Sequence, residues 1–202
     1  MTRGPMTREL TPLAADAVHV VIDMQRLFAE ETAWHVASLP AVIPAIVRLV
    51  AHRPDRALYT RFVTPPDLGA ARSNWRDYYR HWPQVIGDRL SPDVFDLVAP
   101  FKAGAAQLVD KEGFSAFSGP EFLPRLGDLG AETLVLSGVE TDVCVLATAL
   151  EAVDRGFHVV IAVDAVTSFS PAGHRAVLDH VLPRYEHLIQ LAEAADILAA
   201  WR

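Results

Sequence analysis

The chain has 202 residues, of which 51% are hydrophobic and 21% charged, with a formal net charge of −7. This length and composition predict a single globular domain over residues 1–202, with a loose N-terminal segment over residues 1–12. The acidic balance argues against nucleic acid as a partner, because nucleic-acid-binding surfaces are basic. No apolar run reaches the roughly 18 residues of a membrane helix, and a single cysteine cannot form an internal disulfide. We therefore expect a cytoplasmic protein without a membrane partner.

Short apolar runs rich in β-branched residues alternate with segments of helical periodicity along the chain. This alternation predicts an α/β domain with a mostly parallel, six-stranded sheet. The predicted strands are residues 18–23, 57–63, 107–111, 134–138, 158–163 and 187–191. The predicted helices are residues 40–52, 120–126, 143–153, 171–182 and 192–201.

Residues 64–106 are the least regular part of the sequence, with five prolines and a group of aromatic residues. Trp75, Tyr78, Tyr79 and Trp82 recur at the spacing of one helical face. Such a stripe favours a short helix packed on a core. It also suits a lid or pocket wall that encloses an apolar substrate, and both interpretations can hold together.

The only cysteine, Cys144, follows an apolar strand and a glycine turn at Gly138. Thr141 and Asp142 are good helix-capping residues, so the pattern predicts a helix whose first turn contains Cys144. Free N–H groups and the helix dipole favour an anion at that position, which would lower the pKa of the thiol. The alternative is a buried, inert thiol, as most free cysteines are.

Two charged residues stand at the ends of other predicted strands: Asp23 after the first and Lys111 after the third. Because ligands of open parallel sheets bind at the carboxyl ends of the strands, one cleft can gather Asp23, Lys111 and Cys144. Attack of a thiol on a carbonyl needs a deprotonated sulfur, a proton carrier and donors for the oxyanion. Asp23 can take the thiol proton, and Lys111 can stabilise the negative charges. Taken singly, each could equally be a loop residue or a solvated charge.

Three segments of the sequence resemble the isochorismatase-like cysteine hydrolases, which include nicotinamidases and N-carbamoylsarcosine amidohydrolase. They are Val21–Gln25, Lys111 with Ser115–Phe117, and Ser137–Cys144. The resemblance spans residues 17–195 and implies a three-layer α/β/α, Rossmann-like fold. It also implies a catalytic triad and an oligomeric enzyme, a dimer or tetramer.

The same resemblance implies a cis peptide between Val139 and Glu140, which would aim the N–H groups of Glu140 and Cys144 into an oxyanion hole. The implied reaction is hydrolysis of a C–N bond in a small amide or carbamoyl substrate, through a thioester on Cys144. Two alternatives stay open: an isochorismatase-type vinyl ether hydrolase, whose known examples lack the cysteine, and a non-catalytic small-molecule binder of the same fold.

Aromatic residues near the three strand ends predict a partly apolar substrate pocket. The candidates are Phe28, Trp75, Tyr78, Trp82, Phe114 and Phe117. Arg61 or Arg72 could meet a substrate carboxylate. Nicotinamidases carry an aspartate and histidines after the second strand, but residues 53–80 contain no histidine. We therefore expect no metal and no cofactor, with the eight scattered histidines in structural or surface roles.

Overall fold

The structure is a computed structural model that describes residue 10 and residues 12–202. It contains a six-stranded, all-parallel sheet in the order β3-β2-β1-β4-β5-β6, which confirms the predicted fold class. The predicted loose segment lies almost entirely outside the described residues. The strands are β1 Val18–Ile22, β2 Ala57–Phe62, β3 Leu108–Lys111, β4 Thr133–Val139, β5 His158–Thr167 and β6 Ile189–Ala192.

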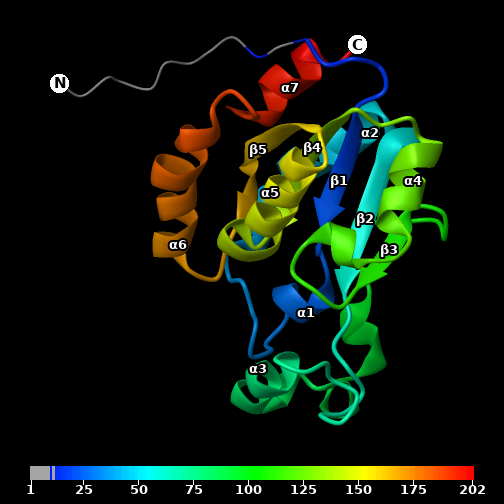
Figure 1. Cartoon of the computed structure of the whole chain (residues 1–202), viewed down its shortest axis with the longest axis vertical. Helices are drawn as coiled ribbons and strands as arrows, with labels where there is room; N and C mark the ends of the chain where they lie inside the picture. The colour runs from blue at the N-terminus through cyan, green and yellow to red at the C-terminus, as the bar shows by residue number, and fades with distance from the viewer. Residues whose placement is uncertain (1–9, 11) are drawn as a thin grey trace.

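Helices cover both faces of the sheet and give the three-layer arrangement (Figure 1). Helices α2 and α7 pack on one face, and α4 and α5 pack on the other, where Val177 after α6 also lies. The helices are α1 Arg26–Ala29, α2 Leu39–His52, α3 Trp75–His81, α4 Phe122–Asp128, α5 Leu146–Asp154, α6 Pro171–Ala176 and α7 Ala194–Ala200.

The central strand β1 shows why the sequence selects this arrangement. Every residue from Val18 to Ile22 is buried. Val20 and Ile22 enter the core under α4 and α5, whereas Val21 enters the core under α2. Alternate side chains of a strand point to opposite faces, so an apolar run without polar interruptions fits a sheet covered on both sides.

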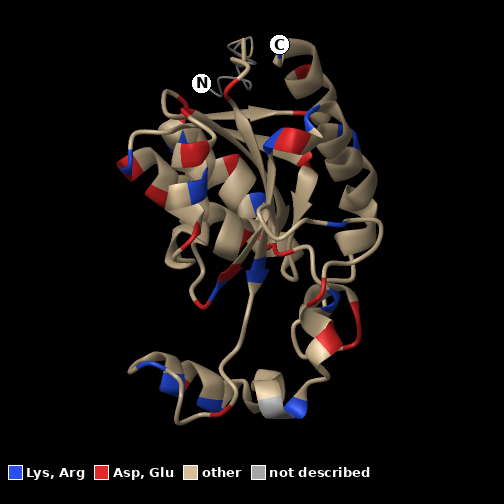
Figure 2. Cartoon of the chain, turned by 90° about the vertical axis from the view of Figure 1, so that its right-hand side faces the viewer, with Lys and Arg blue, Asp and Glu red and all other residues tan. Residues whose placement is uncertain are grey.

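Residues 64–106 form a lobe beyond the carboxyl ends of the strands, built from α3 and several 3-10 turns (Figures 1 and 2). The 3-10 turns are Pro83–Val85, Gly87–Arg89 and Pro92–Phe95. Most charged residues lie on the helices and loops around the sheet, so the strands are largely free of them (Figure 2). The lobe lies over the edge of the sheet at which Asp23, Lys111 and Cys144 stand at or after the ends of their strands.

Four elements differ most from their sequence-based predictions. The helix predicted over 143–153 is α-helical only from Leu146, after a π-helical turn over Thr141–Val145. Helix α1 was not predicted, because four residues carry too little periodicity. Strand β5 runs to Thr167 instead of residue 163, past a register shift opposite Leu136 and Gly138. The helix predicted over 171–182 changes to a π-helical turn after Ala176.

No helix among the described residues is long and apolar enough to cross a bilayer.

Candidate active site

Asp23 directly follows β1 and is fully buried. Its backbone φ is 51°, which places a residue other than glycine in the left-handed region. The Thr60 hydroxyl of the neighbouring β2 donates to Asp23 Oδ1 (2.6 Å) and accepts from the Asp23 N–H (3.2 Å). Such strained backbone conformations persist where the surroundings hold them and often occur at functional sites.

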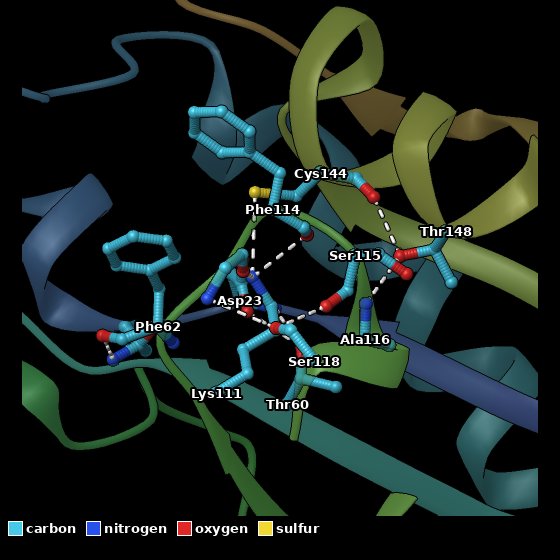
Figure 3. A network of polar contacts seen from close by, with 12 residues as sticks. Asp23, Thr60, Phe62, Lys111, Phe114, Ser115, Ala116, Ser118, Cys144 and Thr148 are labelled. Atoms are coloured by element: carbon cyan, nitrogen blue, oxygen red, sulfur yellow. Dashed lines mark hydrogen bonds and ion pairs between the residues drawn. The ribbon is translucent and has the colours of Figure 1, made fainter. Parts of the chain in front are cut away.

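Lys111 ends β3, where burial alternates so that Asp110 is exposed and Lys111 is buried. Its Nζ lies 2.8 Å from Asp23 Oδ2 and 3.6 Å from the Sγ of Cys144 (Figure 3). It also donates to the carbonyl oxygens of Gly113 (3.0 Å) and Phe114 (3.1 Å). Burial alone lowers the pKa of Lys111, but the charges of Asp23 and Cys144 outweigh it, and the pKa lies above its ordinary value. The lysine is therefore a fixed cation whose side chain, like that of Asp23, is not exposed to water.

Cys144 lies in a π-helical turn, Thr141–Val145, that leads into α5. Its thiol is buried beside Asp23 and Lys111. Burial raises the pKa of the Cys144 thiol; Lys111 lowers it, while the charge of Asp23 and its hydrogen bond raise it further. The expected lowering of this pKa by the helix start is therefore wrong, because desolvation of the thiolate exceeds the help from the lysine. Burial therefore favours the protonated form of the thiol, next to the Asp23 carboxylate.

The predicted capping roles of Thr141 and Asp142 are also wrong. Glu140 precedes the turn without a side-chain capping bond. The Thr141 hydroxyl instead pairs with His174 Nδ1 (2.9 Å), and Asp142 accepts from the Ser168 hydroxyl. These polar side chains thus fasten the Cys144 turn to the segment that follows β5. The Val139–Glu140 peptide is cis, as the resemblance implies.

A cavity of about 210 Å³ opens above Cys144, between the sheet edge and the lobe. Seven of its eleven lining residues are aromatic, and the only charged one is Glu140. Trp34 is the centre of this wall, with ring contacts to Phe28, Phe62, Tyr78 and Trp82. The lining residues are Phe28, Ala33, Trp34, Phe62, Tyr78, Trp82, Phe114, Glu140, Val143, Cys144 and Phe169.

The structure brings four of the six predicted pocket aromatics to this cavity: Phe28, Tyr78, Trp82 and Phe114. Trp75 is not in the lining and packs behind it, against Phe62 and Phe114.

Phe117 requires a larger correction, because it lies away from the cavity. It packs against Phe122 and Phe157, in the layer of α4 and α5.

Both interpretations of the aromatic stripe, a packed helix and a pocket wall, hold in part. Tyr79 is buried in the core, while Tyr78 and Trp82 line the cavity.

Sequence reasoning missed five lining residues: Ala33, Trp34, Phe62, Val143 and Phe169. Phe62 ends β2 at the same edge as Lys111, which is a signal that could have identified it. Trp34 and Phe169 lie in irregular segments, where periodicity does not predict which way a side chain points.

The two arginines predicted to meet a substrate carboxylate form ion pairs elsewhere. Arg61 pairs with Asp110 (2.7 Å) and Arg72 with Glu112 (3.3 Å).

The donors of a metal site do not gather near the cavity. Among residue 10 and residues 12–202 there is no group of three or more His, Cys, Asp or Glu side chains able to hold an ion. The loop after β2 offers Asp67 without a histidine, and the Asp67 carboxylate accepts from the Ala70 N–H (2.9 Å). These residues do not fit a zinc site, which needs about three protein ligands.

The fold is that of the isochorismatase family. The chain belongs to the isochorismatase family: the Isochorismatase domain model matches residues 17–193. Nicotinamidase 3 of Arabidopsis thaliana is 30% identical over 188 residues, 93% of this chain and 91% of that protein.

Other relatives match over shorter stretches. The uncharacterized isochorismatase family protein PncA of Bacillus subtilis is 40% identical over 72 residues, 36% of this chain and 39% of that protein. The match thus spans less than half of that relative.

Solved structures of the same fold cover nearly the whole chain. A cysteine hydrolase from Pseudomonas syringae pv. phaseolicola superposes with a TM-score of 0.81 at 23% identity, over 98% of both chains. An N-carbamoylsarcosine amidase from Thermoplasma acidophilum gives 0.68 at 20% identity, over 88% of this chain and 96% of that one. At these identities, the two likenesses establish the fold.

Proposed function

We propose that this protein is a cysteine amidohydrolase that cleaves a C–N bond of a small amide or carbamoyl compound through a thioester on Cys144. The observation that carries the proposal is the buried contact among Asp23, Lys111 and Cys144 at the floor of an aromatic cavity. The names of relatives support the class of reaction, since they include a nicotinamidase and an N-carbamoylsarcosine amidase.

The first step moves one proton and forms one bond. Asp23 accepts the proton of Cys144 as the sulfur attacks the substrate carbonyl, whose oxygen becomes an oxyanion. The charge of the site is conserved in this step, because the carboxylate is neutralised as the oxyanion forms. A thiol with a raised pKa therefore reacts without a separate buried thiolate, whose desolvation would be costly.

The backbone N–H groups of Glu140 and Cys144 are the proposed oxyanion donors, at the turn that begins with the cis peptide. The tetrahedral intermediate then expels ammonia or an amine, which leaves with the proton held by Asp23. The C–N bond breaks in this step, and the acyl group stays on Cys144 as a thioester.

A water molecule completes the cycle. Asp23, again a carboxylate, takes a proton from this water as its oxygen attacks the thioester. The C–S bond breaks, the sulfur regains the proton from Asp23, and the carboxylic acid leaves. Lys111 keeps its charge throughout and holds Asp23 and the sulfur in position.

The experiment is a screen of amides, carbamates, ureas and hydrazides for released ammonia or amine, with the wild-type protein and Cys144→Ala side by side. We expect turnover of at least one class by the wild type, and an acyl adduct on Cys144 in the mass of protein quenched during turnover. The non-catalytic binder would be favoured if the wild-type protein released no product from any compound of the panel and if no substrate analogue protected its thiol from alkylation. Turnover that survives in Cys144→Ala would exclude the thioester mechanism.

Assembly is a separate proposal. On the resemblance alone, we propose that the protein forms a dimer or tetramer. Sedimentation equilibrium tests it, and a monomer at micromolar concentration would contradict it.

A further inference from the structure

The lining of the cavity above Cys144 combines seven aromatic residues with a single acidic one. Glu140 is the only acidic residue of the lining, which contains no lysine, arginine or histidine. Such a combination is typical of sites that bind organic cations, because the faces of aromatic rings attract positive charge. The wall already accommodates one cation: Lys111 Nζ lies 4.8 Å from the centroid of the Phe62 ring.

The carboxylate is held in place by one of its two oxygens. Glu140 Oε2 accepts a hydrogen bond from the Phe169 N–H (2.9 Å) and lies 3.1 Å from the Ser168 hydroxyl, whose single proton it shares with Asp142. Both contacts are made by Oε2, so neither of them occupies Oε1. The group is therefore oriented by the segment after β5 and keeps acceptor capacity for a ligand.

The charges around the cavity do not cancel. Burial raises the pKa of Glu140, the hydrogen bonds from Phe169 and Ser168 lower it, and the charges of Asp142 and Asp23 raise it again. Asp142 and Asp23 thus add negative charge around Glu140, beside the buried ammonium of Lys111. A bound cation would offset this imbalance, whereas a substrate carboxylate would increase it.

Tyr78 also favours a positively charged ligand in the cavity. Burial raises the pKa of its hydroxyl to about 12, and the charges of Cys144 and Glu140 act in the same direction. The Tyr78 phenol therefore stays neutral near neutral pH, and its aromatic ring lines the same cavity as Glu140. The cavity of about 210 Å³ exceeds the 150 Å³ or so that accepts benzene, so it has room for a small ligand group.

We propose that this cavity selects small amides whose non-reacting end carries a positive charge, such as a quaternary ammonium group, and that Glu140 determines this preference. The proposal rests on the proposed function for the reaction at Cys144, and adds the class of substrate. It replaces the sequence-based expectation of an arginine and a substrate carboxylate.

Three primary amides of matched length test the preference. The first is butyramide with a terminal trimethylammonium group, the second has a tert-butyl group in its place, and the third is the half-amide of glutaric acid. Calorimetry with Cys144→Ala measures their dissociation constants without turnover. We expect the ammonium amide to bind about tenfold more tightly than the tert-butyl amide, with the glutaric half-amide weakest.

The variant Glu140→Gln, combined with Cys144→Ala, should reduce the ratio between the first two ligands to about one. Glu121→Gln is the matched control, because it removes the same charge from an exposed position at the start of α4. A thermal melt of each variant shows whether the substitution also destabilises the segment after β5, which Glu140 contacts at Ser168 and Phe169. If Cys144→Ala does not fold, protection of the wild-type thiol from iodoacetamide by each ligand gives the same ranking.

Equal binding of the ammonium and tert-butyl amides, tighter binding of the anionic one, or no binding of any of the three would overturn the proposal. The same would follow if the ratio survived in Glu140→Gln. Ammonia release by the wild type separates the two proposals. Binding with the expected ranking but without hydrolysis of any amide contradicts the proposed function alone, while hydrolysis without charge preference contradicts the substrate class alone.

Discussion

The Lys111 ammonium and the Asp23 carboxylate form a fully buried ion pair, 2.8 Å from Nζ to Oδ2, although β2 separates their strands in the sheet. Breaking such a pair from one side leaves an uncompensated charge in the interior. We expect Lys111→Met to lower the free energy of unfolding by about 3–5 kcal/mol, measured by urea denaturation.

Two matched variants accompany this measurement. Lys102→Met removes an exposed lysine and should change stability by about 0.5 kcal/mol at most. Asp23→Asn combined with Lys111→Met should be more stable than Lys111→Met alone, because it removes both charges. A Lys111→Met protein as stable as the Lys102→Met control would show that the pair does not matter for folding.

The alkylation rate of Cys144 should depend on pH in a way that reflects burial. Because the pKa of the buried thiol is raised, labelling by iodoacetamide should reach half its maximal rate above the pH of about 8.5 typical of a free thiol. Asp23 raises this pKa and Lys111 lowers it, so Asp23→Asn should move the profile to lower pH and Lys111→Met to higher pH. A wild-type midpoint below about pH 8.5 would contradict the described environment.

The stability of the protein at alkaline pH follows from the same shift. Folding raises the pKa of Cys144, so this residue contributes stability that is complete below the unfolded value of about 8.5 and is lost as pH rises through the higher folded value. We expect the unfolding free energy of the wild type to decline above about pH 8.5, and Cys144→Ala to lack the part of the decline that begins there. Identical pH profiles for the two proteins would exclude this linkage.

Thr60 is expected to act as a positioning residue, because it binds both the carboxylate and the N–H of Asp23. Thr60→Val keeps the shape but removes these hydrogen bonds. We predict that kcat falls about 10–100-fold with KM nearly unchanged, and that Thr60→Ser restores most of the rate. A proportional rise of KM with unchanged kcat would assign Thr60 to substrate binding instead.

An added side chain at Gly138 would meet rigid backbone next to the site. Its φ is +109°, and an added Cβ would stand 2.0 Å from the carbonyl oxygen of Ile22, next to Asp23. Gly138→Ala should cost about 3 kcal/mol or more of unfolding free energy. Gly130→Ala, at φ +59° with open space around it, should cost about 1 kcal/mol. Equal losses for the two variants would mean that backbone conformation, and not the close approach to β1, sets the cost.

Much of the architecture was predictable because it depends on local patterns. The run from Val18 to Ile22 identifies a doubly covered strand, and the ends of three strands place Asp23, Lys111 and Cys144 at one edge. The site's electrostatics were not predictable, since the sign of the shift in the Cys144 pKa depends on how completely the folded chain buries it.

The pocket wall was only partly predictable for a related reason. Tyr78 and Trp82 belong to a helical stripe, but periodicity does not say which of its members faces a cavity and which faces the core. Trp34 and Phe169 come from segments without regular structure, and they meet only in the folded chain. The aromatic character of Phe117 suits a substrate pocket as well as the core in which it lies.

Rates of the Asp23→Asn, Cys144→Ala and doubly substituted proteins test the central claim most directly, with the best amide from the panel as substrate. We predict that each single change lowers kcat at least about a thousandfold, and that the double variant is no slower than Cys144→Ala, because the two groups act in one step. A Cys144→Ala protein within about tenfold of the wild-type rate, or losses that multiply in the double variant, would contradict the mechanism.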